Sequence, residues 1–197
     1  LLTFQGLMVM MLAHGLSSAA LFIMCGQIYE RLHTRDMRLM GGIWGQFRYL
    51  PFFLMFFSAA LMGIPGLGNF IGEFLILMGA FGQFPVFTII AAISLVFAGL
   101  YTLIMIHRAM FGKPNPEQEV HYTQPLKDLN AREISLLMIA VVGLVWLGMY
   151  PQTVLDISNS SMDWIVNSYI PGLTQVAVEH VDTVAEPLVQ ATQAEIQ

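Results

Sequence analysis

The chain is built from long apolar runs separated by short polar stretches. A helix needs about 20 apolar residues to cross roughly 30 Å of hydrocarbon. Four runs meet this requirement, and they cover residues 4–29, 49–84, 86–111 and 134–150. The pattern therefore predicts an all-α integral membrane protein with four transmembrane helices.

The second run, residues 49–84, is too long for one straight crossing, because a helix of roughly 35 residues reaches about 50 Å. Its middle contains Pro65 together with Gly63, Gly66 and Gly68. Proline removes a backbone donor and glycine favours unwinding, so we predict a helix that is discontinuous over residues 63–69. A simple proline kink and a re-entrant hairpin of two half-helices remain alternatives.

The Lys and Arg residues occupy only two regions, which begin at Arg31 and at Arg108. Basic residues are enriched in the cytoplasmic loops of membrane proteins. We therefore expect loops 30–48 and 112–132 on the cytoplasmic side of a bacterial inner membrane. The C-terminus is then expected on the periplasmic side.

The hydrophobic pattern weakens after Pro151. Residues 162–170 predict a short amphipathic helix on the outer surface, anchored by Trp164 and Tyr169 and followed by an acidic tail. This divides the chain into a transmembrane bundle, residues 1–151, and a periplasmic segment, residues 152–197. The tail carries acidic residues without a basic partner, so nucleic acid is not an expected partner.

Composition narrows the possible chemistry. Hydrophobic residues make up 56% of the chain and charged residues only 11%, which fits a membrane protein and not a soluble domain. A single cysteine excludes an internal disulfide and a multi-cysteine iron–sulfur site in this chain. Neither a Walker loop nor a dinucleotide fingerprint is present, so redox chemistry is not expected here. The chain begins without Met in the approach to an apolar run, so we expect it to be a piece of a longer protein.

His14 is the first ionisable group inside a predicted span. Ser17 and Ser18 lie about one turn away at helical spacing. Imidazole titrates near neutral pH, so His14 is a candidate for holding a water molecule or passing on a proton. The alternative is a structural histidine that bonds a neighbouring helix.

Glu73 is the second ionisable group inside a predicted span. It follows the Gly and Pro residues of the predicted break by about one turn, and Asn69 lies between those residues and Glu73. An isolated carboxylate in hydrocarbon costs about 2.5–3.5 kcal/mol on insertion scales. Our hypothesis is that Glu73 alternates between its protonated and ionised forms. The alternative is a permanently neutral acid that bonds to the loosened backbone.

Two strings of residues resemble the antiporter-like subunits of respiratory complex I. The first begins at His14 and reads HGLSSAALF, and the second covers residues 63–74 and reads GIPGLGNFIGEF. The sequence Tyr150-Pro151-Gln152 after the last apolar run adds to the resemblance, which extends through about residue 160.

The resemblance implies that the chain corresponds to the last four helices, eleven to fourteen, of a fourteen-helix proton-translocating subunit. It implies that His14 and Glu73 belong to a proton relay, with Ser17, Ser18 and Asn69 as possible support. Quinone reduction elsewhere in the complex would drive the relay electrostatically. It also implies that FMN, iron–sulfur clusters and quinone bind to other subunits and that this chain holds no cofactor or metal. The expected partners are neighbouring membrane subunits and lipids.

Three other functions remain open. A multisubunit cation/proton antiporter or an energy-conserving membrane hydrogenase would share the broken helix and the central histidine. In a purely structural membrane scaffold, His14 and Glu73 would only bond between helices. Activity that follows Na⁺ and ignores NADH and quinone would favour the antiporter.

Overall fold

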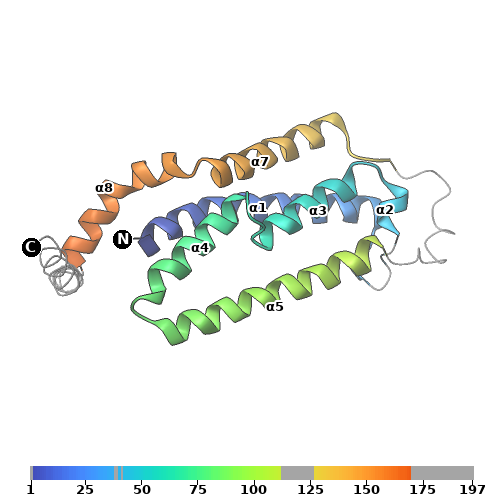
Figure 1. Cartoon of the computed structure of the whole chain (residues 1–197). Helices are drawn as coiled ribbons and strands as arrows, with labels where there is room; N and C mark the ends of the chain where they lie inside the picture. Colours follow the sequence, from blue (N-terminus) through green and yellow to red (C-terminus); the bar gives the residue numbers. More distant parts are fainter. Residues whose placement is uncertain (1, 38–39, 41, 112–126, 170–197) are drawn as a thin grey trace, which may run out of the picture.

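A computed structural model describes residues 2–37, 40, 42–111 and 127–169 (Figure 1). Every regular element in these ranges is helical, so the predicted all-α class is confirmed for the described chain. The helices are α1 (Leu2–Leu32), α2 (Ile43–Gln46), α3 (Leu50–Leu61), α4 (Gly68–Phe81), α5 (Pro85–Met110), α7 (Ala131–Met149) and α8 (Gln152–Tyr169). Three of them, α1, α5 and α7, are long and apolar enough to cross a membrane, whereas α3 and α4 are shorter apolar helices.

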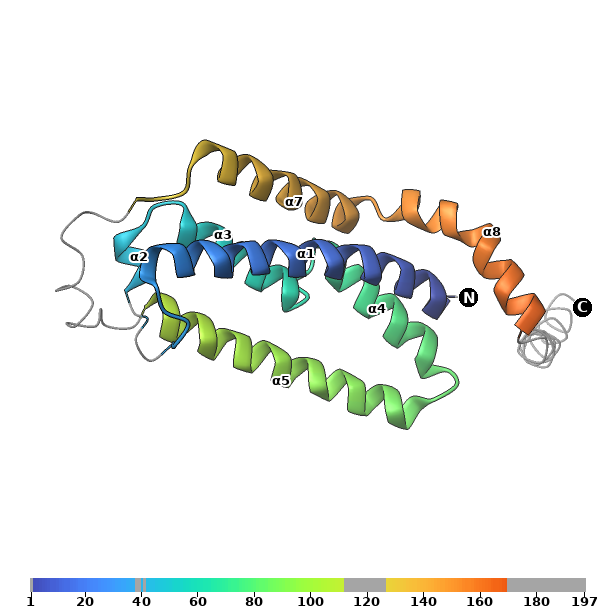
Figure 2. The same cartoon turned by 180° about the vertical axis from the view of Figure 1, so that it is seen from behind.

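Helix α1 runs through the middle of the bundle, and α3 and α4 follow one another along it (Figures 1 and 2). Helices α5 and α7 lie on opposite sides of this central layer in both views. The core contains apolar side chains from α1, α3, α7 and the end of α5, including Met24, Phe57, Leu144 and Met110. Helix α4 continues along α1 beyond the end of α3 and does not fold back beside it.

Residues 62–67 separate α3 from α4. The last turn of α3 tightens, since Gly63 donates its N–H to the Ala60 carbonyl at 3.1 Å. Gly63 then adopts a φ of 69° and Gly66 a φ of 100°, a region that disfavours side chains. Pro65 lies between these two glycines, whereas Gly68 and Asn69, which we included in the predicted break, are the first two residues of α4.

Helices α1 and α4 form the most extensive helix contact of the bundle. Gly72 makes it possible, because a Cβ atom at this position would lie 2.7 Å from the Cα atom of Met10. Gly68 is equally confined, with the Cβ atoms of Leu147 and Ala13 at 2.8 and 2.9 Å from the place of its missing Cβ. Small residues therefore let α4 pack directly against the backbone of α1, as is common between membrane helices.

The prediction for the segment after Pro151 was wrong about where its helix begins. We expected a short helix over residues 162–170, but α8 begins at Gln152. The Pro151 carbonyl accepts the N–H groups of Val154 and Leu155, at 3.0 and 3.1 Å, and so starts the new helix. Val154 packs against the bundle core. Polar residues surround it in the sequence, so a hydrophobicity profile does not reveal this apolar position. Residue 170 and the acidic tail lie outside the described residues.

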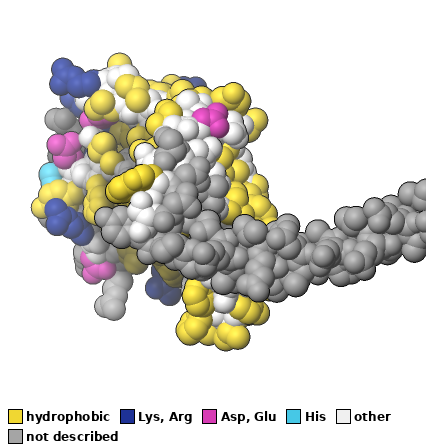
Figure 3. Space-filling view, turned by 90° about the vertical axis from the view of Figure 1, so that its left-hand side faces the viewer, with side chains coloured by type: hydrophobic (Ala, Val, Ile, Leu, Met, Phe, Trp, Pro, Cys, Tyr) yellow, Lys and Arg dark blue, Asp and Glu magenta, His cyan; other side chains and the backbone are white. Residues whose placement is uncertain are grey.

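Large apolar side chains cover much of the outer surface. On α5, Phe87 and Val96 are 73% and 72% exposed. The space-filling view shows hydrophobic side chains over continuous areas of the described surface (Figure 3). Exposed apolar areas of this kind mark a surface that membrane or protein covers.

The described basic residues gather at one end of the bundle, where α1 and α5 end and α3 and α7 begin (Figure 1). They are Arg31, Arg35, Arg48, Arg108, Lys127 and Arg132. Arg38, Lys113 and most of loop 112–132 lie outside the described residues. We call this end of the bundle the basic end.

Candidate functional site

Asn69 connects the first turn of α4 to α1. Its Nδ2 atom donates to the Ser17 Oγ atom at 3.1 Å, and both side chains are fully buried. Ser17 in turn donates to the backbone carbonyl of His14 at 3.1 Å. Two of the predicted supporting residues therefore join the helix break to the backbone of the predicted relay histidine.

The His14 side chain lies on the other side of this connection. It is exposed on α1, and its Nε2 atom lies 3.1 Å from the Oγ atom of Ser18. The two serines that we placed beside His14 thus have different positions, since Ser17 faces α4 and Ser18 faces outward with the imidazole. The imidazole therefore borders a surface of this chain and not its interior.

Glu73 reaches back to the break. The side chain is half-buried, and its carboxylate occupies the place where a Cβ atom of Gly63 would stand. Only glycine at position 63 leaves this space, and the left-handed backbone there also favours glycine. The break thus provides the room in which the carboxylate lies.

The break contacts α7, although residues 64–66 are exposed on its other side. The backbone of Gly66 lies directly against Gly148 of α7, where a side chain on residue 148 would collide with it. Gly68 is held between Ala13 of α1 and Leu147 of α7. Helix α7 therefore contacts the non-helical segment, and α1 and α7 together confine the first residue of α4.

Two buried polar atoms near the break have no hydrogen-bond partner among the described residues: Ser58 Oγ and Asn69 Oδ1. Leaving such an atom unpaired costs about 1–3 kcal/mol, so atoms of this kind call for an explanation. No hydrogen bond within the described chain joins Glu73 to Asn69 or to His14. The structure therefore brings the predicted residues to one region without a continuous hydrogen-bonded path.

Sequence reasoning missed a second polar site, at the basic end, which we call the clamp and define as Arg31, Asp128 and Glu133. Arg31 forms an ion pair with Glu133 at 3.0 Å, with side chains only 10% and 18% exposed. It also donates to the backbone carbonyls of Lys127 and Asp128, at 2.8 and 3.1 Å. Arg31 therefore fastens the start of α7 to the end of α1.

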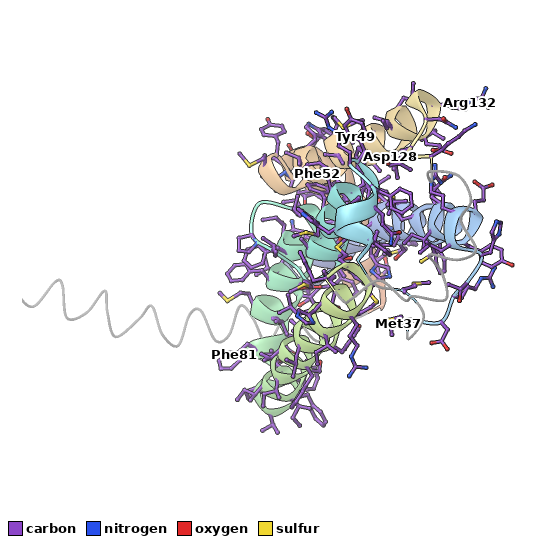
Figure 4. The ribbon with its side chains drawn as sticks, turned by 90° about the vertical axis from the view of Figure 1, so that its right-hand side faces the viewer. Met37, Tyr49, Phe52, Phe81, Asp128 and Arg132 are labelled. Atoms are coloured by element: carbon purple, nitrogen blue, oxygen red, sulfur yellow. The ribbon has the colours of Figure 1, made fainter. Side chains whose placement is uncertain are left out.

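The Asp128 carboxylate extends the clamp to α3. It accepts the backbone N–H groups of Arg48 and Tyr49 at 2.7 and 2.8 Å, as the view from the basic end illustrates for Tyr49 (Figure 4). Leu129 and Leu50 donate to it as well. Burial by itself would raise the pKa of Asp128, but these four donors together lower it below its ordinary value. The spacing Asn130-x-x-Glu133, a capping box at the start of α7, is the one sequence signal that pointed to this site.

These features define the class of the protein. It is a multi-pass α-helical membrane protein with ionisable side chains set into apolar helices beside a non-helical segment. Residues 2–100 match the family described as NADH:quinone oxidoreductase/Mrp antiporter, TM, and the chain belongs to that family.

The chain is similar to proteins named NADH-quinone oxidoreductase subunit M. The relative from Pseudomonas aeruginosa is 59% identical over 158 residues, which are 80% of this chain and 30% of the relative. The relative from Escherichia coli (strain K12) is 50% identical over 171 residues, which are 85% of this chain and 33% of the relative. The chain thus spans about a third of the length of these relatives.

A solved structure shares the fold. A chain of "Respiratory complex I from Thermus thermophilus with bound NADH" superimposes with a TM-score of 0.66 and 24% sequence identity. The match covers 75% of this chain and 31% of that chain. The helical arrangement described above is therefore one that occurs in a membrane-bound respiratory complex.

Proposed function

We propose that this chain is the part of a proton-translocating subunit of NADH–quinone oxidoreductase that carries the last carboxylate of the proton path. The observation that carries the proposal is the carboxylate of Glu73, which lies against the break between α3 and α4. The family match and the relatives named subunit M support it. The whole subunit then works within a complex whose other subunits bind FMN, iron–sulfur clusters and quinone.

In this proposal α3 and α4 form one discontinuous crossing, so that the chain crosses the membrane four times. Non-helical backbone at membrane depth is tolerated where it is buried in protein or lines a wet cavity. The Gly66 backbone lies against Gly148 of α7, but residues 64–66 are exposed in this chain, so in this proposal the rest of the full-length subunit covers them. The basic end lies in the cytoplasm, because basic loops remain on that side. Residues 1–151 form the membrane bundle, and residues 152–197 lie on the periplasmic side.

The proposed relay runs from His14 to Glu73. The exposed imidazole faces the part of the full-length subunit that this chain does not include, and from there it receives a proton. A change of charge at His14 alters the free energy of ionising Glu73, because interactions between charges are strong where water is scarce. Ser17, Ser18 and Asn69 support the path by fixing α4 on α1 and by orienting the imidazole.

The energy requirement is moderate. Moving one charge against a membrane potential takes about 2.3 kcal/mol per 100 mV. A change of this size in the free energy of ionising Glu73 is within reach of one nearby charge in a medium of low effective dielectric constant. The chain itself then needs neither a cofactor nor a metal, because the redox energy arrives through neighbouring subunits as a change of charge.

The test is the Glu73→Gln variant in the full-length subunit, assembled in its complex in membrane vesicles. We expect normal assembly, because glutamine keeps the size of the side chain and no ion pair is lost. Proton uptake driven by NADH oxidation should fall by most of its value. The matched control is Asp156→Asn, which removes an exposed acid of α8 whose carboxylate accepts a hydrogen bond from the Gln152 side chain. Normal proton pumping by Glu73→Gln would overturn the proposal.

The family description also includes antiporters, so the driving reaction must be tested separately. Proton movement by the wild-type complex should require NADH and quinone and should be insensitive to replacing Na⁺ by K⁺. Proton movement that follows Na⁺ without NADH would assign the chain to the antiporter branch instead.

A further inference from the structure

A cavity of about 500 Å³ opens between α1, α3, α5 and the residues Thr34, Arg35, Met37 and Met40. This volume is in the range of roughly 300–1,000 Å³ that is typical of ligand sites. Its wall is almost entirely apolar and includes Phe22, Met40, Leu54 and Ile106. Along α1 the wall extends from Phe22 to Ile28, which corresponds to a depth of about 9 Å.

The cavity lies at the basic end, and one permanent charge stands at it. Arg35 is exposed, and its guanidinium carbon lies 4.7 Å from the centre of the Tyr29 ring. The contact that the structure gives for the Arg35 guanidinium is this one with the Tyr29 ring. A guanidinium group that an aromatic ring holds in place is well suited to bind a phosphate through two hydrogen bonds.

We propose that this cavity binds one anionic phospholipid, with the head-group phosphate on Arg35 and an acyl chain inside the apolar wall. The combination of a basic residue and an apolar recess at the end of membrane helices is what recognises such lipids. Three methionines, Met37, Met40 and Met105, line the recess, and their flexible side chains adapt to a mobile acyl chain.

The competing occupant is another part of the full-length subunit. Phe22 and Cys25 lie at helical spacing from His14 and Ser18 on the same side of α1, and protein that covers the imidazole would extend toward the cavity. Arg35 decides between the two, because a phosphate requires the positive charge and a packed apolar helix does not.

The experiment uses the full-length subunit in its assembled complex, reconstituted into membranes that contain a photoactivatable lipid. Phosphatidylglycerol and phosphatidylcholine, each with a diazirine in the acyl chain, are compared, and the adducts are mapped by mass spectrometry. We expect phosphatidylglycerol to label the peptides that contain residues 22–28 and 105–109 about fivefold more than phosphatidylcholine, the effect of one basic residue near a membrane surface. Equal labelling by both lipids would overturn the proposal, and this comparison needs no variant.

Two pairs of variants sharpen the test. Arg35→Gln should lower the labelling by phosphatidylglycerol to the level of phosphatidylcholine, whereas Arg48→Gln should not, although Arg48 also lies over a tyrosine ring at this end. Gly26→Leu should reduce labelling by both lipids, because a Cβ atom on Gly26 meets no atom within 4 Å and the side chain can enter the cavity. Gly45→Leu, where a Cβ atom is equally free, is its control.

If the peptides with residues 22–28 and 105–109 carry no label while the exposed surface of α5 is labelled, protein fills the cavity. This result would refute the proposed lipid site. Labelling that Arg35→Gln leaves unchanged would refute the role of the phosphate contact.

Discussion

Removing the Asp128 carboxylate should loosen the first turn of α3. This carboxylate accepts three backbone N–H groups at the start of that helix, from Arg48, Tyr49 and Leu50, at 2.7, 2.8 and 3.4 Å. Helix α3 has no side-chain cap of its own at Tyr49, so Asp128→Ala leaves these donors to water or to lipid head groups.

The size of the effect follows from these contacts. Losing an N-cap side chain costs about 0.5–2 kcal/mol, and hydrogen bonds to charged groups contribute about 1.5–3 kcal/mol. Asp128 is only partly buried and one of its three bonds is long, so we expect a loss of about 2 kcal/mol in the local opening free energy, near the top of the N-cap range. That loss corresponds to about 30-fold faster exchange of the amide hydrogens.

Hydrogen exchange measured by mass spectrometry on the assembled complex tests this directly, because the exchanging amides are the donors themselves. Peptides that contain residues 48–50 should exchange faster in Asp128→Ala and less so in Asp128→Asn, which keeps an acceptor oxygen. Asp156→Ala on α8 is the matched control. The reasoning fails if the α3 peptides exchange within about threefold of wild type, or if the control changes them equally.

The same assay predicts a pH dependence. The pKa of Asp128 lies below its ordinary value of 3.8 in the folded protein. Because the pKa is lower in the folded protein than in the unfolded chain, the ionised carboxylate stabilises the folded state fully when the pH is above the ordinary pKa. This stabilisation is lost as the pH falls from the ordinary pKa through the lower pKa of the folded protein. Protection of residues 48–50, corrected for intrinsic exchange, should therefore be constant above about pH 5 and should decrease below pH 3.8.

Three further experiments test other parts of the structure. In a double-mutant cycle, Arg31→Gln and Glu133→Gln should show a coupling of about 1–2 kcal/mol in the opening free energy of the start of α7, and additivity would exclude a direct interaction. Gly72→Ala should reduce the thermal stability of the complex, since overpacking costs about 1–3 kcal/mol, whereas Gly82→Ala, with free space around it, should not. Asn69→Leu removes a buried unpaired acceptor, so assembly should be unchanged while proton pumping falls; unimpaired pumping would exclude Asn69 from the path.

The long helices could be predicted from the sequence because membrane crossings leave a strong signal. Apolar runs at residues 4–29, 86–111 and 134–150 became α1, α5 and α7 with boundaries shifted by a few residues. Length alone also indicated that residues 49–84 do not form one straight helix. The start of α8 was missed because its buried face contains only a few apolar residues among polar ones, so that average hydrophobicity conceals it.

The polar contacts were less predictable. The periodicity of the sequence shows which residues share one face of a helix, but it does not show which residues of another helix contact that face. Asn69 and Ser17 meet across 52 positions of the chain, and Arg31 meets Glu133 across 102. Arg31 resembled any arginine at the end of a membrane helix, where surface ion pairs contribute little. Nothing in the sequence around Arg31 showed that the segment beginning at residue 127 returns to cover it.

The cap on α3 has a consequence for the synthesis of the protein. Leu50 precedes Asp128 by 78 residues. At roughly 5–20 residues per second, a ribosome needs about 4–16 s to make that stretch, and for this time the nascent α3 has left the ribosome without the carboxylate that will cap it. Until then water or lipid head groups must satisfy the first N–H groups of α3, so this end of the bundle reaches its final form only when the segment before α7 has been made.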